Sequence, residues 1–135
     1  MSSTEMVRVR DVMKTEFDMV DGLATVADAL RGMKYIDTKA LIVRKRNDDD
    51  EFGILELEDI ATNVLARNRA PERVNVYEIM NKPLIGIDPE MDIRYCARMF
   101  ERYQLNRAAV VEQRSVIGIV SYADIVIKGM KQLLS

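Results

Sequence analysis

The chain has 135 residues, of which 48% are hydrophobic, 31% charged and 6% aromatic, and this composition is typical of a folded globular protein. Its 20 Lys and Arg and 22 Asp and Glu give a formal net charge of -2. Nucleic acid is therefore not expected as the main partner, because binding to a phosphate backbone requires a basic excess or a basic face. The sequence has no His, which excludes His metal sites and His general bases, and its one Cys excludes an internal disulfide.

No apolar run approaches the roughly 20 residues that a membrane-spanning helix needs. The stretch Met1–Val12 carries charges throughout and has no apolar core, so we do not expect a signal peptide or a membrane partner. One unpaired Cys is consistent with a reducing compartment, and the predicted location is cytoplasmic.

The amino-terminal half predicts an alternation of short strands and helices. Its elements are a short apolar segment, a turn at 21–22, a helix capped by Thr25, strands at 40–43 and 52–55, and a helix at 59–67. The segment 68–73, which contains Pro71, then reads as a connection.

The carboxy-terminal half repeats this order. Its elements are an apolar segment, a turn at 88–89, a helix capped by Asp92, strands at 108–111 and 116–120, and a helix at 124–134. Three stretches match between the halves, at offsets of 67, 68 and 65 residues: Val7–Met13 with Val74–Met80, Lys39–Val43 with Arg107–Val111, and Phe52–Ile60 with Ile117–Ile125. We predict an α+β fold of two tandem strand-helix-strand-strand-helix units, 7–69 and 70–135, that together form one compact module.

The repeated pattern of hydrophobic residue, Gly, hydrophobic residue and a later Asp resembles the CBS domain (cystathionine-beta-synthase domain). Gly53 with Asp59 and Gly118 with Asp124 carry the resemblance, together with the openings that end in Met13 and Met80. Two such units in tandem resemble a Bateman module. The resemblance implies that the units pack about a pseudo-twofold axis, form two clefts between them and bind adenosine-containing ligands there.

Ser121 and Asp124 are the sharpest candidate site residues. The resemblance implies that Asp124 accepts hydrogen bonds from both ribose hydroxyls and that Ser121 contacts phosphate. An ionised carboxylate accepts hydrogen bonds only, so it suits a vicinal diol. The same Ser-x-x-Asp spacing also fits a capping box that stabilises the last helix, and the two interpretations are compatible.

Further contacts for this first cleft follow from the resemblance. Arg107 would reach phosphate, since its planar fork binds phosphate at two points, and Asn106 would assist. The adenine ring would lie against Leu84, Ile85 and Ile119, although the same residues also fit an ordinary core.

The other half departs from the pattern. Asp59 is present, but Glu56 stands where Ser or Thr is expected, and a carboxylate there would repel a ligand phosphate. The remaining predicted contacts of this second, weaker cleft are Lys39, which the sequence match pairs with Arg107, and the apolar Ile54 and Phe17. We expect this cleft to be empty, to take an uncharged nucleoside or to bind something else.

The predicted function is regulatory. The chain would bind AMP, ADP, ATP or S-adenosylmethionine, would need no cofactor or metal, would form a homodimer and would signal to a separate effector protein. No catalytic residues are predicted, because the sequence lacks a P-loop, an activated nucleophile and a close carboxylate pair in a cleft motif. The alternative is an assembly module that dimerises without a small molecule.

Overall fold

The computed structural model describes residues 6–134. The start of the charged amino-terminal stretch and the last residue of the second predicted repeat lie outside the described residues. The chain divides into two compact units. One consists of the segment that ends at Thr15 and the chain from Ile85 onward, and we call it the Asp124 unit. The other consists of Glu16–Leu84, and we call it the Asp59 unit.

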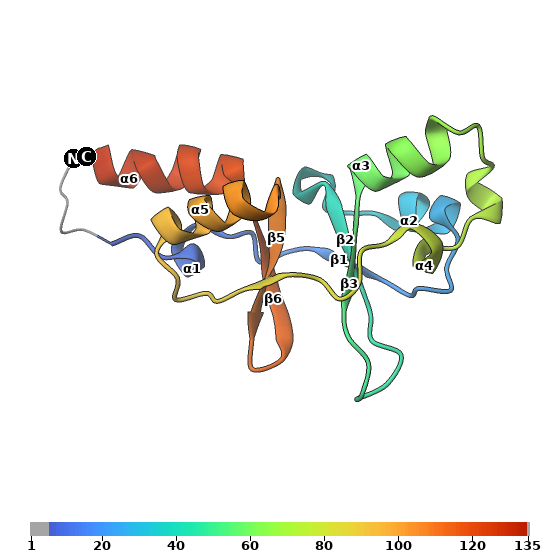
Figure 1. The fold of residues 1–135 in the computed structure, drawn as a ribbon, viewed down its shortest axis with the longest axis horizontal. Coiled ribbons are helices and arrows are strands. Elements are labelled where there is room, and N and C mark those ends of the chain that lie inside the picture. The colour runs from blue at the N-terminus through green and yellow to red at the C-terminus, as the bar shows by residue number, and fades with distance from the viewer. Residues whose placement is uncertain (1–5, 135) are drawn as a thin grey trace. The chain divides into compact units, whose positions relative to one another are not determined.

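The Asp59 unit is built on a three-stranded sheet of order β1-β2-β3, with β1 parallel and β3 antiparallel to β2. Figure 1 shows α2, α3 and α4 beside this sheet. The elements are β1 (Asp18–Val20), α2 (Val26–Gly32), η1 (Ile36–Thr38), β2 (Ala40–Val43), β3 (Gly53–Glu56), α3 (Leu57–Ile60), the π-helical η2 (Ala61–Leu65), η3 (Pro71–Arg73) and α4 (Val76–Ile79).

The Asp124 unit has the same layout, with a sheet of order β4-β5-β6. Strand β4 is parallel and β6 antiparallel to β5, and α5 and α6 lie together beside the sheet (Figure 1). The elements are α1 (Val9–Val12), β4 (Gly86–Ile87), α5 (Ile93–Tyr103), β5 (Arg107–Glu112), β6 (Ser115–Ser121), the π-helical η4 (Asp124–Met130) and α6 (Lys131–Leu134).

The predicted order of strands and helices is confirmed in both units. The predicted caps form: Thr25 Oγ1 accepts from the Asp28 amide at 3.0 Å, and Asp92 Oδ1 accepts from the Arg94 amide at 2.9 Å. All four residues of β2 are buried, as the continuous apolar run predicts. Each unit has its own core, centred on Leu41 and Leu55 in one and on Phe100 and Ile87 in the other.

Each unit takes its leading short helix from the far side of the repeat boundary. Helix α1 packs with the second repeat, where the Val9 amide donates to the Met91 carbonyl at 2.9 Å. Helix α4 packs with the first repeat, where the Val76 amide donates to the Ala24 carbonyl at 2.9 Å. The division of the sequence into repeats 7–69 and 70–135 stays a prediction, and the compact units divide the chain elsewhere.

The sheet register corrects one sequence match. Ala40 pairs with Glu56, and Arg107 pairs with Ser121, which is the counterpart of Glu56. The structural counterpart of Arg107 is therefore Ala40, and Lys39 corresponds to Asn106. The pairing of Lys39 with Arg107 was wrong by one residue, because the alignment of two short apolar runs does not fix which side chain faces which side of a sheet.

Candidate functional site

Asp124 is the first residue of η4, two helical residues after β6 ends, and its side chain is only 1% exposed. Its Oδ2 accepts hydrogen bonds from the Ser121 amide at 2.9 Å and the Ser121 hydroxyl at 3.0 Å. The Ser121 Oγ in turn lies 3.3 Å from the Asp124 amide nitrogen. This is the geometry of the capping interpretation.

Two lysines hold the other oxygen of the same carboxylate. Lys14 Nζ lies 2.7 Å and Lys128 Nζ 3.1 Å from Asp124 Oδ1. Burial acts to raise the pKa of Asp124, but the hydrogen bonds and charges of the lysines, with the Ser121 amide, outweigh burial and hold this pKa below its ordinary value. Asp124 is thus an ionised carboxylate whose two oxygens are both engaged within the chain.

The sequence analysis missed both lysines. Lys128 could have been found, because it lies four residues after Asp124 on a predicted helix, where side chains meet. Lys14 gave no such signal. It reaches Asp124 because residue 14 makes two backbone hydrogen bonds of 2.9 Å with Ile119 on β6. This contact joins the amino-terminal segment, which ends at Thr15, to the Asp124 unit.

The other predicted residues of this site differ in accessibility. Arg107 is 8% exposed and pairs with Ser121 in the sheet, so its backbone lies beside that of Ser121. The Asn106 carbonyl accepts from the Tyr122 amide at 3.3 Å, which places Asn106 at the same end of β6. Ile119 is 1% exposed and belongs to the core, whereas Ile85 is 41% exposed. Leu84 ends the Asp59 unit, where its amide donates to the Phe52 carbonyl at 3.0 Å.

In the second predicted site, Asp59 is partly exposed rather than sealed. Its Oδ2 accepts from the Glu56 amide at 2.9 Å and from Asn81 Nδ2 at 3.1 Å. Asn81 stands where Lys14 stands in the other unit, since it exchanges two backbone hydrogen bonds of 2.9 Å with Ile54. A neutral amide therefore replaces a charged ammonium beside this carboxylate.

The remaining predicted residues of the second site belong to the same unit as Asp59. Lys39 follows η1 in a left-handed conformation with φ of 59°, and its carbonyl accepts from the Leu57 amide at 3.1 Å. Ile54 is 7% exposed, and Phe17 is partly buried just before β1.

The electrostatic difference between the two sites is large. Five equivalent positions hold three cations and one carboxylate in the Asp124 unit, and two carboxylates and no cation in the Asp59 unit. The pairs of equivalent residues are Lys14 and Asn81, Arg107 and Ala40, Ser121 and Glu56, Asp124 and Asp59, and Lys128 and Asn63. The first set of positions therefore has an excess of positive charge and the second an excess of negative charge.

Comparison with known proteins assigns the family. A family model described as "CBS domain" matches residues 76–130. The structure of a hexameric CBS-CP12 protein from bloom-forming cyanobacteria is 36% identical, over 91% of this chain and 71% of that chain, with a TM-score of 0.86. The chain belongs to the CBS-domain family. CBS-domain proteins are regulatory, and the predicted α+β fold with small sheets is confirmed.

Other relatives match this CBS protein over most of its length. Hypoxic response protein 1 of Mycobacterium tuberculosis is 28% identical over 121 residues, which is 89% of this chain and 83% of that protein. An uncharacterised protein of Methanocaldococcus jannaschii is 25% identical over 80% of this chain, and the match spans 59% of that protein's length. A CBS domain pair solved with 5′-methylthioadenosine and S-adenosyl-L-methionine shares the fold, at 20% identity over 96% of this chain and all of that chain, with a TM-score of 0.71.

Metal-binding groups and membrane-spanning helices are both absent from the part of this CBS protein that the structure describes. Between residues 6 and 134, no three His, Cys, Asp or Glu side chains are grouped in a way that could hold a metal ion. No helix in the same range has the length and apolar character to cross a bilayer.

Proposed function

We propose that this chain is a regulatory protein that binds an adenosine-containing nucleotide beside Ser121 and Asp124 and passes the change to a separate partner. The observation that carries the proposal is the pair of lysines, Lys14 and Lys128, on one ionised carboxylate, with Arg107 paired to Ser121 on the adjacent strand. This arrangement combines cations that suit a phosphate with an acceptor that suits a ribose diol.

Both oxygens of Asp124 are engaged, so binding requires an exchange of partners. A ligand phosphate would draw Lys14 or Lys128 from Asp124 Oδ1, and the released oxygen would accept from the ribose hydroxyls. Lys128 is the more mobile candidate, since its side chain is 49% exposed against 20% for Lys14. The lysines also hold the α1 segment, because Lys128 Nζ donates to the Val12 carbonyl at 3.3 Å. The exchange would therefore loosen this contact and give the ligand an effect on the structure.

The Asp59 site suits a different adenosine ligand. Its carboxylate is partly exposed and keeps Oδ1 for a diol, but Glu56 adds a second negative charge. Two unit charges about 4 Å apart repel by about 4 kcal/mol near a protein surface, so a phosphate is disfavoured there. An uncharged or cationic adenosine compound fits better. The CBS pair solved with 5′-methylthioadenosine and S-adenosyl-L-methionine shows that this fold accepts both kinds in another protein.

Thermal unfolding tests the proposal, because a ligand that binds only the native state raises the unfolding temperature. AMP and 5′-methylthioadenosine would be added separately to the wild-type chain and to the matched variants Asp124→Asn and Asp59→Asn. We expect Asp124→Asn to abolish stabilisation by AMP and Asp59→Asn to abolish stabilisation by 5′-methylthioadenosine. Absence of stabilisation by both compounds in the wild-type chain would exclude the proposal.

The second candidate is an assembly module. Four apolar side chains of the last helix are 45–68% exposed, more than a solitary chain needs: Val126, Ile127, Met130 and Leu134. The related CBS-CP12 protein is hexameric. Homodimer formation through this helix is compatible with nucleotide binding, and Ile127→Glu would test it by reducing the mass measured by light scattering.

A further inference from the structure

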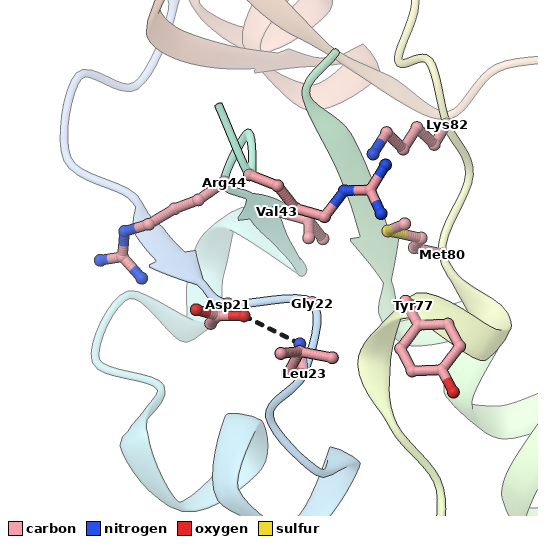
Figure 2. A pocket seen from close by; sticks show the side chains of 9 residues that line it. Asp21, Gly22, Leu23, Val43, Arg44, Tyr77, Met80 and Lys82 are labelled. Carbon is pink, nitrogen blue, oxygen red and sulfur yellow. Dashed lines mark hydrogen bonds between the residues drawn. The ribbon is translucent and has the colours of Figure 1, made fainter. Parts of the chain in front are cut away.

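The Asp59 unit contains a cavity of about 360 Å³ at the carboxyl ends of β1 and β2. Residues 21–23 follow β1, Val43 and Arg44 end and follow β2, and Tyr77 and Met80 come from α4 and its end (Figure 2). Lys39 and Asp59 lie at the opposite end of β2, so this cavity is not the predicted nucleotide site. Its volume lies within the range of pockets that hold small molecules.

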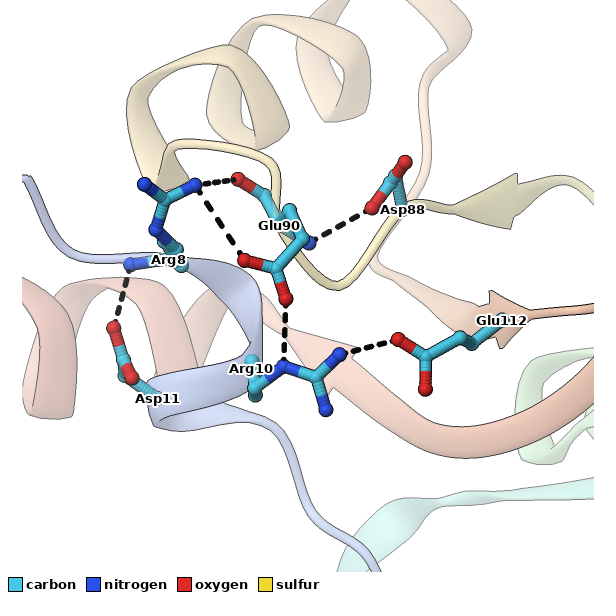
Figure 3. A network of polar contacts seen from close by, with 6 residues as sticks. All are labelled: Arg8, Arg10, Asp11, Asp88, Glu90 and Glu112. Atoms are coloured by element: carbon cyan, nitrogen blue, oxygen red, sulfur yellow. Dashed lines mark hydrogen bonds and ion pairs between the residues drawn. The ribbon is translucent and has the colours of Figure 1, made fainter.

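The same place in the Asp124 unit carries ion pairs. The Tyr77 amide donates to the Gly22 carbonyl at 2.9 Å, and the Arg10 amide donates to the Pro89 carbonyl at 2.8 Å, so Tyr77 and Arg10 are equivalent. Arg10 Nε lies 2.8 Å from Glu90 Oε1, and the same guanidinium pairs with Glu112 (Figure 3).

Additional contacts reinforce this network. Arg8 Nη1 donates to the Glu90 carbonyl at 3.0 Å, and hydrogen bonds to Glu90 and Glu112 raise the pKa of Arg10. At the offset of 67 residues, Leu23 stands where Glu90 stands. The Asp59 unit thus has Leu23 and Tyr77 in place of the Glu90–Arg10 ion pair.

The walls of the open cavity are apolar. Val43 and Met80 line it together with Leu23 and Tyr77, and the last two are unusually exposed for such residues, at 73% and 52%. Exposed apolar side chains around a concave site favour a ligand with an apolar or aromatic body.

The charges around the cavity are mostly positive. Arg44, Arg46 and Lys82 line it against one carboxylate, Asp21, which accepts from the Leu23 amide at 2.9 Å. Asp50 pairs with Lys82 at 2.7 Å and with Arg46 at 3.2 Å, and it fixes both cations beside the cavity. Lys82 is equivalent to Thr15, so the Asp124 unit has no cation at that position.

We propose that this cavity binds a small organic anion, in which a carboxylate or phosphate meets Lys82 and Arg46 and an apolar body lies between Leu23 and Tyr77. The site is separate from both predicted nucleotide sites, and the proposal does not depend on them. Ammonium and guanidinium groups recognise carboxylate and phosphate by the same charge-assisted hydrogen bonds, so the shared chemistry is the anion.

The test uses the full chain labelled with ¹⁵N and two probes, benzoate and phenyl phosphate, with phenol as the neutral control. We expect both anions to shift the amide resonances of Gly22, Leu23 and Tyr77, with phenol binding about tenfold more weakly. Lys82→Met should weaken both anions about tenfold.

A sharper test transfers the Glu90–Arg10 ion pair into the cavity. Leu23→Glu with Tyr77→Arg copies the Glu90–Arg10 pair into the cavity at two exposed positions, and it should abolish the shifts. The reciprocal double variant, Glu90→Leu with Arg10→Tyr, is the matched control and should leave probe binding unchanged. Unchanged resonances in the wild-type chain, equal binding of phenol and benzoate, or binding that survives the transfer of the ion pair would each overturn the proposal. Binding of only one of the two anions would retain the site and identify the preferred anionic group.

Discussion

The two units share a backbone framework but differ in the charges that they carry. The amides of Val9, Arg10 and Lys14 make the same backbone hydrogen bonds in the Asp124 unit as those of Val76, Tyr77 and Asn81 make in the Asp59 unit. On this common framework, one unit places two lysines on its carboxylate and ion pairs at the far end of its sheet. The other places an amide on its carboxylate and a cavity at the far end of its sheet. A duplicated framework can thus carry different charges at equivalent positions.

Asp124 and Asp59 occupy equivalent positions in the two units. Their substitution by alanine should nevertheless destabilise the protein by very unequal amounts. Asp124→Ala leaves Lys14 and Lys128 without their shared counterion and should lower the free energy of unfolding by about 3 kcal/mol. Asp59→Ala removes two hydrogen bonds from a partly exposed group and should cost about 1 kcal/mol. Urea unfolding measures both, and equal losses would contradict the difference between the sites.

The equivalent glycines of the two units should also respond differently. A Cβ added at Gly118 would lie 2.6 Å from the Lys14 carbonyl oxygen, whereas one at Gly53 would lie 3.2 Å from the Asn81 carbonyl oxygen. The backbone at Lys14 is closer to Gly118 than the backbone at Asn81 is to Gly53. Gly118→Ala should therefore lower the free energy of unfolding by about 2 kcal/mol, and Gly53→Ala by about 1 kcal/mol. Urea midpoints measured for both variants would test this order, and a more destabilising Gly53→Ala would reverse it.

Acid should reveal the lysine-held carboxylate. Because the native pKa of Asp124 is below its ordinary value of 3.8, its stabilisation is present above that pH and is lost as the pH falls through the lower native value. Unfolding free energies measured from neutral pH to pH 2 should therefore fall less steeply for Asp124→Asn than for the wild-type chain. Identical slopes would show that the two lysines do not lower this pKa.

Asp50 in the Asp59 unit provides a second test of the same acid dependence. Hydrogen bonds from Lys82 and the Arg46 amide lower the pKa of Asp50, so Asp50→Asn should also reduce the acid dependence. Asp59→Asn serves as the control at a carboxylate with a neutral side-chain partner.

The smallest expected effect belongs to the ion pairs at the far end of the sheet of the Asp124 unit. Arg10 and Glu90 have side chains that are 42% and 53% exposed, and exposed pairs contribute little because water and salt screen them. Arg10→Met should leave the urea midpoint unchanged within error at high salt. A clear loss of stability in 1 M NaCl would show that the network has a structural role.

Elements with a strong local pattern could be predicted from the sequence. Apolar runs gave β2 and β5, and capping residues gave the starts of α2 and α5, because these signals act over a few neighbouring residues. The Ser121–Asp124 contact was also predictable from its spacing, since it joins residues three apart.

Contacts that depend on the exchange of segments could not be predicted in the same way. Lys14 reaches Asp124 across 110 residues, and nothing near Lys14 in the sequence announces that contact. The register of the β2 and β5 sheets likewise depends on hydrogen bonds to β3 and β6, so the match of Lys39 to Arg107 failed by one position. One sheet carries ion pairs at its far end and the other a cavity. This difference depends on the equivalence of Arg10 and Tyr77, which backbone hydrogen bonds establish.

The central claim is that a nucleotide takes the place of a lysine on Asp124. Carbon-detected NMR of the ¹³C-labelled chain, with the side-chain carboxyl signals of Asp124 and Asp59 assigned by Asn variants, measures this directly. We predict that saturation with AMP shifts the Asp124 carboxyl signal and leaves the Asp59 signal in place. AMP binding with an unmoved Asp124 signal, or a shift confined to Asp59, would contradict the account.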